Sequence, residues 1–192
     1  MRVQMNVGEE AASRALSFPP NSDYVDLRND PHGVQQIPAA RENPPLRNFL
    51  EALNGGQAIF ATFAASVREG TGEKSNDAED SFGSRVALIF ADADLNSQRD
   101  LYEQLAVQLA GLLLRESGDA ILCELEVARC AFAGGVGQCL RIKLTARAAS
   151  QDQARLRWGL AMARLQQALL YCSRQIRQKM SPTGTPAETT SN

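Results

Sequence analysis

The chain of 192 residues contains a single histidine, and this scarcity excludes much familiar catalytic chemistry. His32 lies in a stretch rich in Pro and Asn, so no histidine in the patterned part of the chain can activate a serine or a cysteine. No CxxC spacing occurs among the four cysteines, which are Cys123, Cys130, Cys139 and Cys172. We interpret them as reduced, small apolar residues, with a zinc site made of cysteine alone as the alternative. We expect no cofactor.

Long hydrophobic runs and a strong net charge are also lacking. Every apolar stretch is broken by a charge or a glycine before the roughly 20 residues that a membrane span needs. Residues 1–11 carry charge and no apolar core of a secretory signal, so we expect a cytoplasmic protein without membrane contact. With a net charge of −2 and a pI of about 5.5, no field of the whole chain attracts nucleic acid.

The distribution of proline and polar residues divides the chain into three parts. Residues 1–44 contain five prolines and no helix or strand period, which predicts an extended or disordered arm. Residues 45–180 carry the hydrophobic patterns of one α+β domain, interrupted at 69–84 by an acidic stretch that we predict to be a mobile loop. The Ser-, Thr- and Pro-rich residues 181–192 predict a disordered tail.

The patterned part predicts seven elements in the order helix, strand, strand, helix, strand, strand, helix. Their expected ranges are 46–53, 59–68, 85–93, 97–116, 120–132, 140–146 and 150–178. Two ββα units in tandem predict a two-layer sandwich, with a four-stranded antiparallel sheet, two long helices on one face and a short N-terminal helix. This order resembles the two-layer fold of the pterin carbinolamine dehydratases and, more loosely, that of secretion chaperones. The histidine-rich site of the dehydratases has no counterpart here.

The two later strands predict their own register. Folding them about Ala133 and Gly134 places Glu126 opposite Arg141 and Glu124 opposite Lys143. The same fold pairs aliphatic residues on the other face, and a shift by one residue would destroy both sets of pairs. In the strand 120–132 the apolar parity changes after Ala128, which predicts a bulge near Arg129.

The earlier strand pair looks too apolar to face water alone. The alternation at 59–67 and the apolar run at 85–93 leave part of the second face uncovered, so a helix or a second copy of the chain has to cover it. The last helix also carries an apolar seam that can meet a partner. We therefore expect a homo-oligomer, most simply a dimer, with these interface residues: Phe60, Ile89, Trp158, Met162, Leu165, Leu169 and Ile176.

One acidic run follows the strand 85–93 and has the spacing of an oxygen-ligand loop. The candidate ligands of a calcium ion or another hard cation are Asp92, Asp94, Asn96, Asp100 and Glu103. Ser97 stands where such a loop needs glycine, and a strand rather than a helix precedes the run. The other interpretation is a strand-to-helix junction whose acids stabilise the start of the next helix.

The last helix is basic, with Asp152 as its one acid, and a basic helix can contact phosphates. Aromatic residues for base stacking are not interleaved with its arginines, so a solvated face is the simpler interpretation.

Our first hypothesis is a binding or assembly protein that self-associates, rather than an enzyme, and binding of a different protein as its partner is left open. The alternatives are a small enzyme or hard-cation-binding protein with its site at Asp92–Glu103, and a nucleic-acid binder that uses the last helix.

Overall fold

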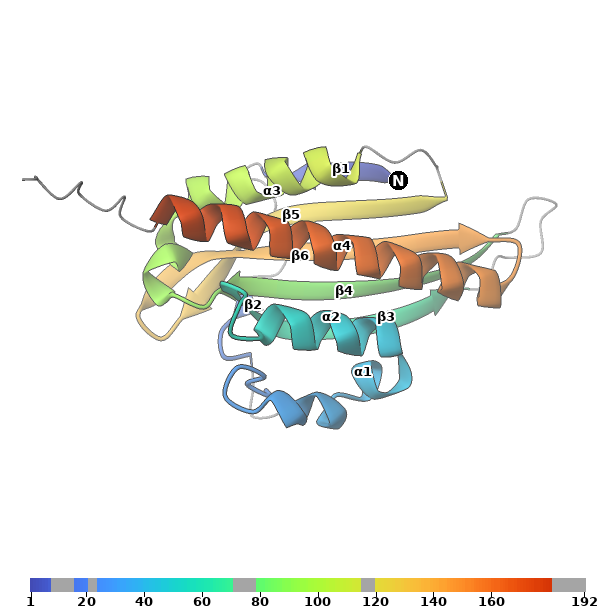
Figure 1. The fold of residues 1–192 in the computed structure, drawn as a ribbon, viewed down its shortest axis with the longest axis horizontal. Coiled ribbons are helices and arrows are strands. Elements are labelled where there is room, and N and C mark those ends of the chain that lie inside the picture. The colour runs from blue at the N-terminus through green and yellow to red at the C-terminus, as the bar shows by residue number, and fades with distance from the viewer. Residues whose placement is uncertain (8–15, 21–23, 71–78, 115–119, 181–192) are drawn as a thin grey trace, which may run out of the picture.

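The fold is α+β, and its sheet is larger than the sequence predicts. The computed structural model describes residues 1–7, 16–20, 24–70, 79–114 and 120–180. The strands are β1 (Arg2–Asn6), β2 (Leu16–Ser17), β3 (Phe60–Gly70), β4 (Asp80–Phe90), β5 (Ile121–Phe132) and β6 (Gly135–Ala148). They form one sheet in the order β1-β5-β6-β4-β3, and β2 also pairs with β5 (Figure 1).

Among the four strands β3 to β6, the pairs β3–β4, β4–β6 and β6–β5 are all antiparallel, as the tandem ββα pattern predicts. The expectation of four strands is nevertheless corrected, because β1 and β2 both join the outer edge of β5 in parallel and make the sheet mixed. Both added strands come from the N-terminal segment, and at five and two residues they are too short to show a strand period.

The β5–β6 hairpin has the register that its sequence predicts. Glu126 lies opposite Arg141 and Glu124 opposite Lys143, and the turn is formed by Ala133 and Gly134 between the paired residues Phe132 and Gly135. The predicted bulge near Arg129 is wrong, since the pairing of β5 and β6 runs without a shift over its whole length. The apolar parity of β5 changes there for another reason. From Ala128 on, its apolar side chains also face a second buried cluster on the other side of the sheet.

Three helices cover one face of the sheet, with α4 in the middle (Figure 1). The helices are α1 (Pro38–Glu42), α2 (Pro44–Asn54), α3 (Arg99–Leu113) and α4 (Gln151–Met180), and the 3-10 turns are η1 (Pro31–Gln36) and η2 (Ala93–Ser97). α4 packs on β6 and β4 between α2 and α3, and α1 lies near the edge strand β3. The expected short N-terminal helix is therefore α2, in the same layer as the two long helices.

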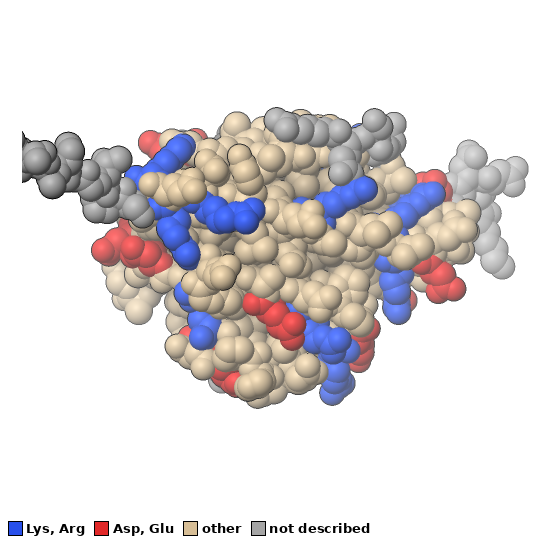
Figure 2. All heavy atoms as spheres, viewed as in Figure 1, with Lys and Arg blue, Asp and Glu red and all other residues tan. Residues whose placement is uncertain are grey.

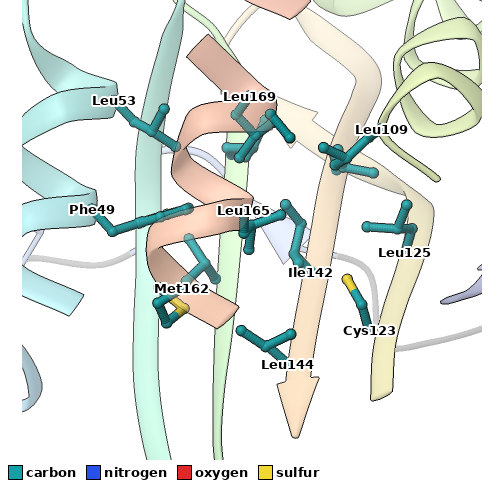
Figure 3. Close-up of a cluster of buried hydrophobic side chains, with 14 of the residues drawn as sticks. Phe49, Leu53, Leu109, Cys123, Leu125, Ile142, Leu144, Met162, Leu165 and Leu169 are labelled. Carbon is teal, nitrogen blue, oxygen red and sulfur yellow. The ribbon is translucent and has the colours of Figure 1, made fainter. Parts of the chain in front are cut away.

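The main core lies between this helix layer and the sheet. Figure 3 shows Leu165 and Leu169 of α4 among side chains from α2, β6 and α3. Leu165, Leu169 and Ile142 are each at most 2% exposed. Burying a side chain of this size contributes about 1.5–3 kcal/mol, so the apolar seam of α4 is fully used within one chain.

A bulge in β3 between Thr62 and Ala64 changes which side chains face the helices. The sequence predicts one parity for Ala61, Phe63, Ala65 and Val67. In the structure Ala61 and Phe63 belong to a second, smaller cluster on the other face, whereas Ala65 and Val67 pack against the main core. The single alternation expected for this strand is thus split, because a bulge inserts one extra residue and shifts the parity.

The second cluster is covered by the chain's own N-terminal segment, which we call the strap and define as residues 16–20 and 24–27. Phe18 of the strap contacts three aromatic rings: its centroid lies 5.4 Å from that of Tyr24, 5.7 Å from that of Phe63 and 6.0 Å from that of Phe132. Beneath the strap the buried residues are Ala61, Phe63, Ala87, Ile89, Ala128, Cys130 and Cys139. The apolar half that the sequence leaves uncovered is therefore closed within the molecule.

The expected arm and the expected acidic loop both contain regular structure in their described parts. Residues 1–44, expected as an extended or disordered arm, hold β1, β2, η1 and α1 in their described parts. Arg28 fixes this segment to the start of β3 by donating from Nη1 to the carbonyls of Ala58 at 3.1 Å and Phe60 at 2.8 Å. β3 and β4 extend into the expected loop 69–84 from both sides. Its residues 71–78 and the expected tail 181–192 lie outside the described residues.

Across the described ranges, no helix combines the length and the hydropathy that a transmembrane span requires, although α4 reaches 30 residues.

Truncation of Phe18 tests whether the strap belongs to the cooperative fold. We expect Phe18→Ala to lower the free energy of unfolding by about 1–3 kcal/mol, because a half-buried ring loses three aromatic contacts. Urea denaturation followed by circular dichroism measures the change. Val136→Ala, at a side chain that is 61% exposed, is the control and should change stability by less than about 0.5 kcal/mol. Equal stability of both variants would show that the strap is not part of the cooperative unit.

Candidate functional site

The face of the sheet opposite α2, α3 and α4, which we call the open face, is polar beyond the strap. Strand register aligns one row across it, Ser66–Arg85–Lys143–Glu124–Gln4, from β3 through β4, β6 and β5 to β1. The neighbouring row is Ala64–Ala87–Arg141–Glu126–Asn6. Directly opposed side chains in such rows have Cβ atoms about 4.5–5.5 Å apart, so each row is a continuous line of contacts.

Two ion pairs lie on the β5–β6 side of these rows. Arg141 Nη1 is 3.0 Å from Glu126 Oε2, and Lys143 Nζ is 2.5 Å from Glu124 Oε2. The four side chains are between 22% and 43% exposed. Pairs at such exposure contribute about 0–1 kcal/mol each, so they specify the register more than they stabilise the fold.

Positive charge is in excess on the open face. Among the described strand residues that face this side, six are basic and two are acidic, which leaves a surplus of four positive charges in a chain whose net charge is −2. The basic residues are Arg2, Arg68, Arg85, Arg141, Lys143 and Arg147, and the acidic ones are Glu124 and Glu126. Charge is therefore segregated onto this face.

Arg68 and Arg85 are the most available of these cations. Both side chains are exposed, and neither forms a hydrogen bond or ion pair with any residue in the described part of the chain. Arg85 lies opposite Ser66 on β3 and opposite Lys143 on β6, at the middle of the row. The two guanidinium groups can therefore take up an external anion without breaking a contact with the described residues.

Two adjoining hollows give the open face its shape. The larger, of about 870 Å³, extends over the ion pairs and over Ala64 and Ala87. The smaller, of about 460 Å³, lies over Arg68, Gly83 and Thr145 near the far ends of β3 and β4. Both are lined by Ser66, Arg85 and Lys143, so they are continuous at Arg85. A binding partner of the whole face would be elongated.

Three of the five candidate cation ligands, Asp92, Asn96 and Glu103, have other side-chain contacts. Asn96 is buried: its Oδ1 accepts from Phe90 N at 2.9 Å and from the Tyr102 hydroxyl at 2.5 Å, and its Nδ2 donates to Phe90 O at 3.0 Å. Burial raises the pKa of Tyr102 far above its ordinary value, so this hydroxyl stays a donor. Asn96 therefore caps the C-terminal end of β4 through buried hydrogen bonds.

The four acids of that run lie on the outside. Asp92 Oδ1 accepts from the backbone N of Asp94 at 3.1 Å, and Glu103 accepts from Arg99 Nε at 2.7 Å. Asp94 and Asp100 are exposed. No group of three or more His, Cys, Asp or Glu side chains within the described residues could hold a metal ion. The structure thus uses this run as a strand-to-helix junction.

The seven predicted interface residues lie inside one chain. Each is at most 7% exposed, from Phe60, Trp158, Met162 and Leu169 at 0% to Ile176 at 7%. Trp158 also donates from Nε1 to the Ser84 hydroxyl at 3.0 Å beneath α4. The folded chain uses these side chains in its own core, so their assignment to an interface stays a prediction that their burial does not support. Apolar spacing alone does not tell a core seam from an intermolecular one.

The basic residues of α4 do not form one patch. Arg155 pairs with Glu69, Arg157 donates to the carbonyl of Arg147 at 2.7 Å, and Arg177 donates to that of Gln57 at 2.7 Å. On the helix face, Lys and Arg side chains are spaced along the course of α4 with uncharged surface between them (Figure 2). Arg155 and Arg157 therefore bind α4 to β3 and β6, and Arg177 binds it to the loop before β3.

All four cysteines are buried and free. Cys130 and Cys139 lie under the strap on paired strands, and the hydrogen bond with Cys130 together with burial raises the pKa of the Cys139 thiol well above its ordinary value. Burial raises the pKa of Cys123 to about 12 and that of Cys172 to about 11. Sequence analysis interprets these residues as apolar core, and their burial agrees with that.

Sequence reasoning missed Arg68 and Arg85 as site residues. The sequence does place Ser66 and Arg68 on the polar parity of their strand. It does not show that β4 lies between β3 and β6, and this strand order is what places Arg85 opposite Lys143 and puts Arg68 in the same hollow as both. Comparison of the chain with protein-family models, curated proteins and solved structures gave no match. The open face itself therefore carries the functional argument.

Substitution of Asn96 tests its structural role. We expect Asn96→Ala to lower the free energy of unfolding by about 2–4 kcal/mol, because the carbonyl of Phe90 and the Tyr102 hydroxyl each lose a buried hydrogen-bond partner. Asp94→Ala, at an exposed neighbour, should change it by less than about 0.5 kcal/mol. Both are measured by urea denaturation. A rise in melting temperature with millimolar Ca²⁺ that Asp94→Ala abolishes would instead support a cation site.

Thiol labelling tests the burial of the cysteines. We expect none of the four to react rapidly with Ellman's reagent at pH 8 in the folded protein, because each is buried and the pKa values of Cys123, Cys139 and Cys172 lie above that pH. All four should react once guanidinium unfolds the chain. Rapid labelling of one thiol in the folded protein would show that the strap or the helix layer opens readily.

Proposed function

We propose that the protein is a non-catalytic binding protein that holds an acidic segment of a partner protein on the open face of its sheet. The observation that carries this proposal is the surplus of positive charge on that face, with Arg68 and Arg85 exposed and unpaired among the described residues. Charge complementarity of this kind steers association and fixes orientation.

The composition of the open face favours a protein over a nucleic acid. Glu124 and Glu126 lie within the larger hollow, where they would repel a run of phosphates but can accept hydrogen bonds from a partner's donors. The aromatic rings near this face pack against one another around Phe18, and no aromatic side chain is among the described residues that line either hollow. Single-stranded bases, by contrast, are held by stacking on exposed rings.

The same charge disfavours a second copy of the chain as the occupant. Two open faces brought together about a twofold axis would each contribute four surplus positive charges, and like charges across an interface cost affinity. Self-association is expected from an uncovered apolar half of the sheet and from the apolar seam of the last helix. The strap covers that half and the core of the same chain buries that seam. The homo-oligomer stays a prediction that this face does not support.

Charge reversal tests the proposal. The probe is a fluorescein-labelled peptide of ten glutamates, and its anisotropy at low salt reports binding to the full chain. We expect the double variant Arg68→Glu/Arg85→Glu to bind it at least about tenfold more weakly, because two guanidinium–carboxylate contacts become repulsive. Binding to the unchanged protein should also weaken as salt is added.

The matched control carries the same change in net charge at exposed arginines of the helix side, as Arg129→Glu/Arg174→Glu. It should bind the peptide within about twofold of the unchanged protein apart from the general effect of net charge. An equal loss in both double variants would mean that the peptide responds to overall charge, and the proposal would fail. It would also fail if a twenty-nucleotide oligo-dT or phosphatidylserine vesicles bound more tightly than the peptide through Arg68 and Arg85.

A further inference from the structure

We infer that the smaller hollow of the open face is a site for one phosphate group, carried by the partner's acidic segment or free in solution. This inference rests on the proposed function, because it names the chemical group that the partner presents at one end of the face. The hollow is lined on its open side by Arg68, Arg85 and Lys143 together with three hydroxyl side chains.

The strand register brings the two free guanidinium groups to one place. Arg68 on β3 lies opposite Gly83, and Arg85 on β4 lies opposite Ser66, so the arginines occupy diagonal positions on paired strands. Diagonal Cβ atoms are about 7–8 Å apart, which the long arginine side chains can span. A guanidinium group presents a rigid fork of donors that matches two oxygens of a phosphate.

Glycine keeps the floor of the hollow low between these arginines. A Cβ built at Gly83 would lie 2.8 Å from the carbonyl of Leu144 and 3.2 Å from Thr145 Oγ1. Any other residue at this position would displace the neighbouring strand or its hydroxyl group. The space over Gly83, which Arg68 faces directly, is therefore available to a ligand rather than to a side chain.

Hydroxyl groups supply the remaining donors. Ser66 and Thr145 form no hydrogen bond through their side chains with residues that the structure describes, and Ser81 donates to the carbonyl of Gly70 at a long 3.4 Å. Hydroxyl groups rotate to suit their acceptor, so each can turn to an oxyanion. Together with the arginines, these hydroxyl groups provide more hydrogen-bond donors than a carboxylate can accept from. That number of donors suits the oxygens of a phosphate.

The local charge balance also selects a phosphate. Among the described residues, Glu69 is the only acid lining this hollow, and its carboxylate pairs with Arg155 of α4. Lys143 is engaged by Glu124 at 2.5 Å, so no described acid compensates the two positive charges of Arg68 and Arg85. A phosphate monoester carries about −1.5 to −2 at pH 7 and neutralises both, whereas one carboxylate neutralises half.

Titration of the full ¹⁵N-labelled chain with sodium phosphate, against sodium chloride at equal ionic strength, tests the site. We expect saturable shifts of the amide signals of Gly70 and Gly83, which line the hollow, with phosphate and not with chloride. Arg68→Gln and Arg85→Gln should each weaken phosphate binding at least about tenfold, and Arg85→Lys should fall between, because it keeps the charge and loses the fork. Arg174→Gln, on the helix face, should bind as the unchanged chain does.

The source of the phosphate is distinguished with three peptides that differ only in a central phosphoserine, glutamate or serine. Tighter binding of the phosphoserine peptide, lost in Arg85→Gln, supports a phosphate carried on a protein. Binding of free phosphate with no preference among the peptides supports the site with a small phosphate compound as its ligand. Circular dichroism spectra and melting temperatures of the variants show that each is folded.

The outcomes separate this inference from the proposed function. If phosphate shifts Gly70 and Gly83 no more than chloride does, or does so equally in Arg85→Gln, the phosphate site is wrong even when the glutamate peptide still binds. If phosphate binds and the glutamate peptide does not, the site stands and the docking of an acidic protein segment falls.

Discussion

The separation of charged from aliphatic side chains in the β5–β6 hairpin is the constraint on which the rest of the structure depends. Glu124 and Glu126 point to one face with Lys143 and Arg141, and Leu125 points to the other with Ile142. Because a shift by one residue would exchange the faces, this hairpin decides which side of the sheet the helices cover. β4 pairs with β6 on that template, and β1 and β2 pair with β5.

Helices cover only one side of the sheet, so side chains on the other side have to be either polar or covered by another segment. Both solutions occur along the same strands. At one end the open face is apolar and lies beneath the strap, and at the other it is polar and carries the surplus of arginine and lysine. The boundary falls between Ile89, which is buried, and Arg85, which is exposed, within a single strand. Strand β4 thus supplies part of the fold's stability at one end and part of the binding surface at the other.

The parts that could be predicted from the sequence are those whose pattern is local. The register of β5 and β6 follows from charges and aliphatic residues a few positions from one turn, and the buried seam of α4 follows from helical spacing. The bulge in β3 could not be predicted, because Ala61, Phe63, Ala64 and Ala65 offer no contrast that marks a change of face. The strap could not be predicted either, since Leu16, Phe18 and Tyr24 have no regular spacing and acquire their partners from distant strands. Of the candidate site, the polar parity of Arg68 could be predicted. Its proximity to Arg85 could not, because it depends on the register of β3 with β4.

The parallel pairing of β1 with β5 has a consequence for how the chain is made. Arg2 lies beside Leu122, so the first strand meets its neighbour only after roughly 120 further residues, and closing so long a loop costs conformational entropy that local contacts do not repay. During synthesis the N-terminal segment emerges first and waits for the hairpin that completes it. Until then Phe18 and its neighbours have no completed surface to cover, so the apolar side chains of the strap stay exposed while the rest of the chain is made.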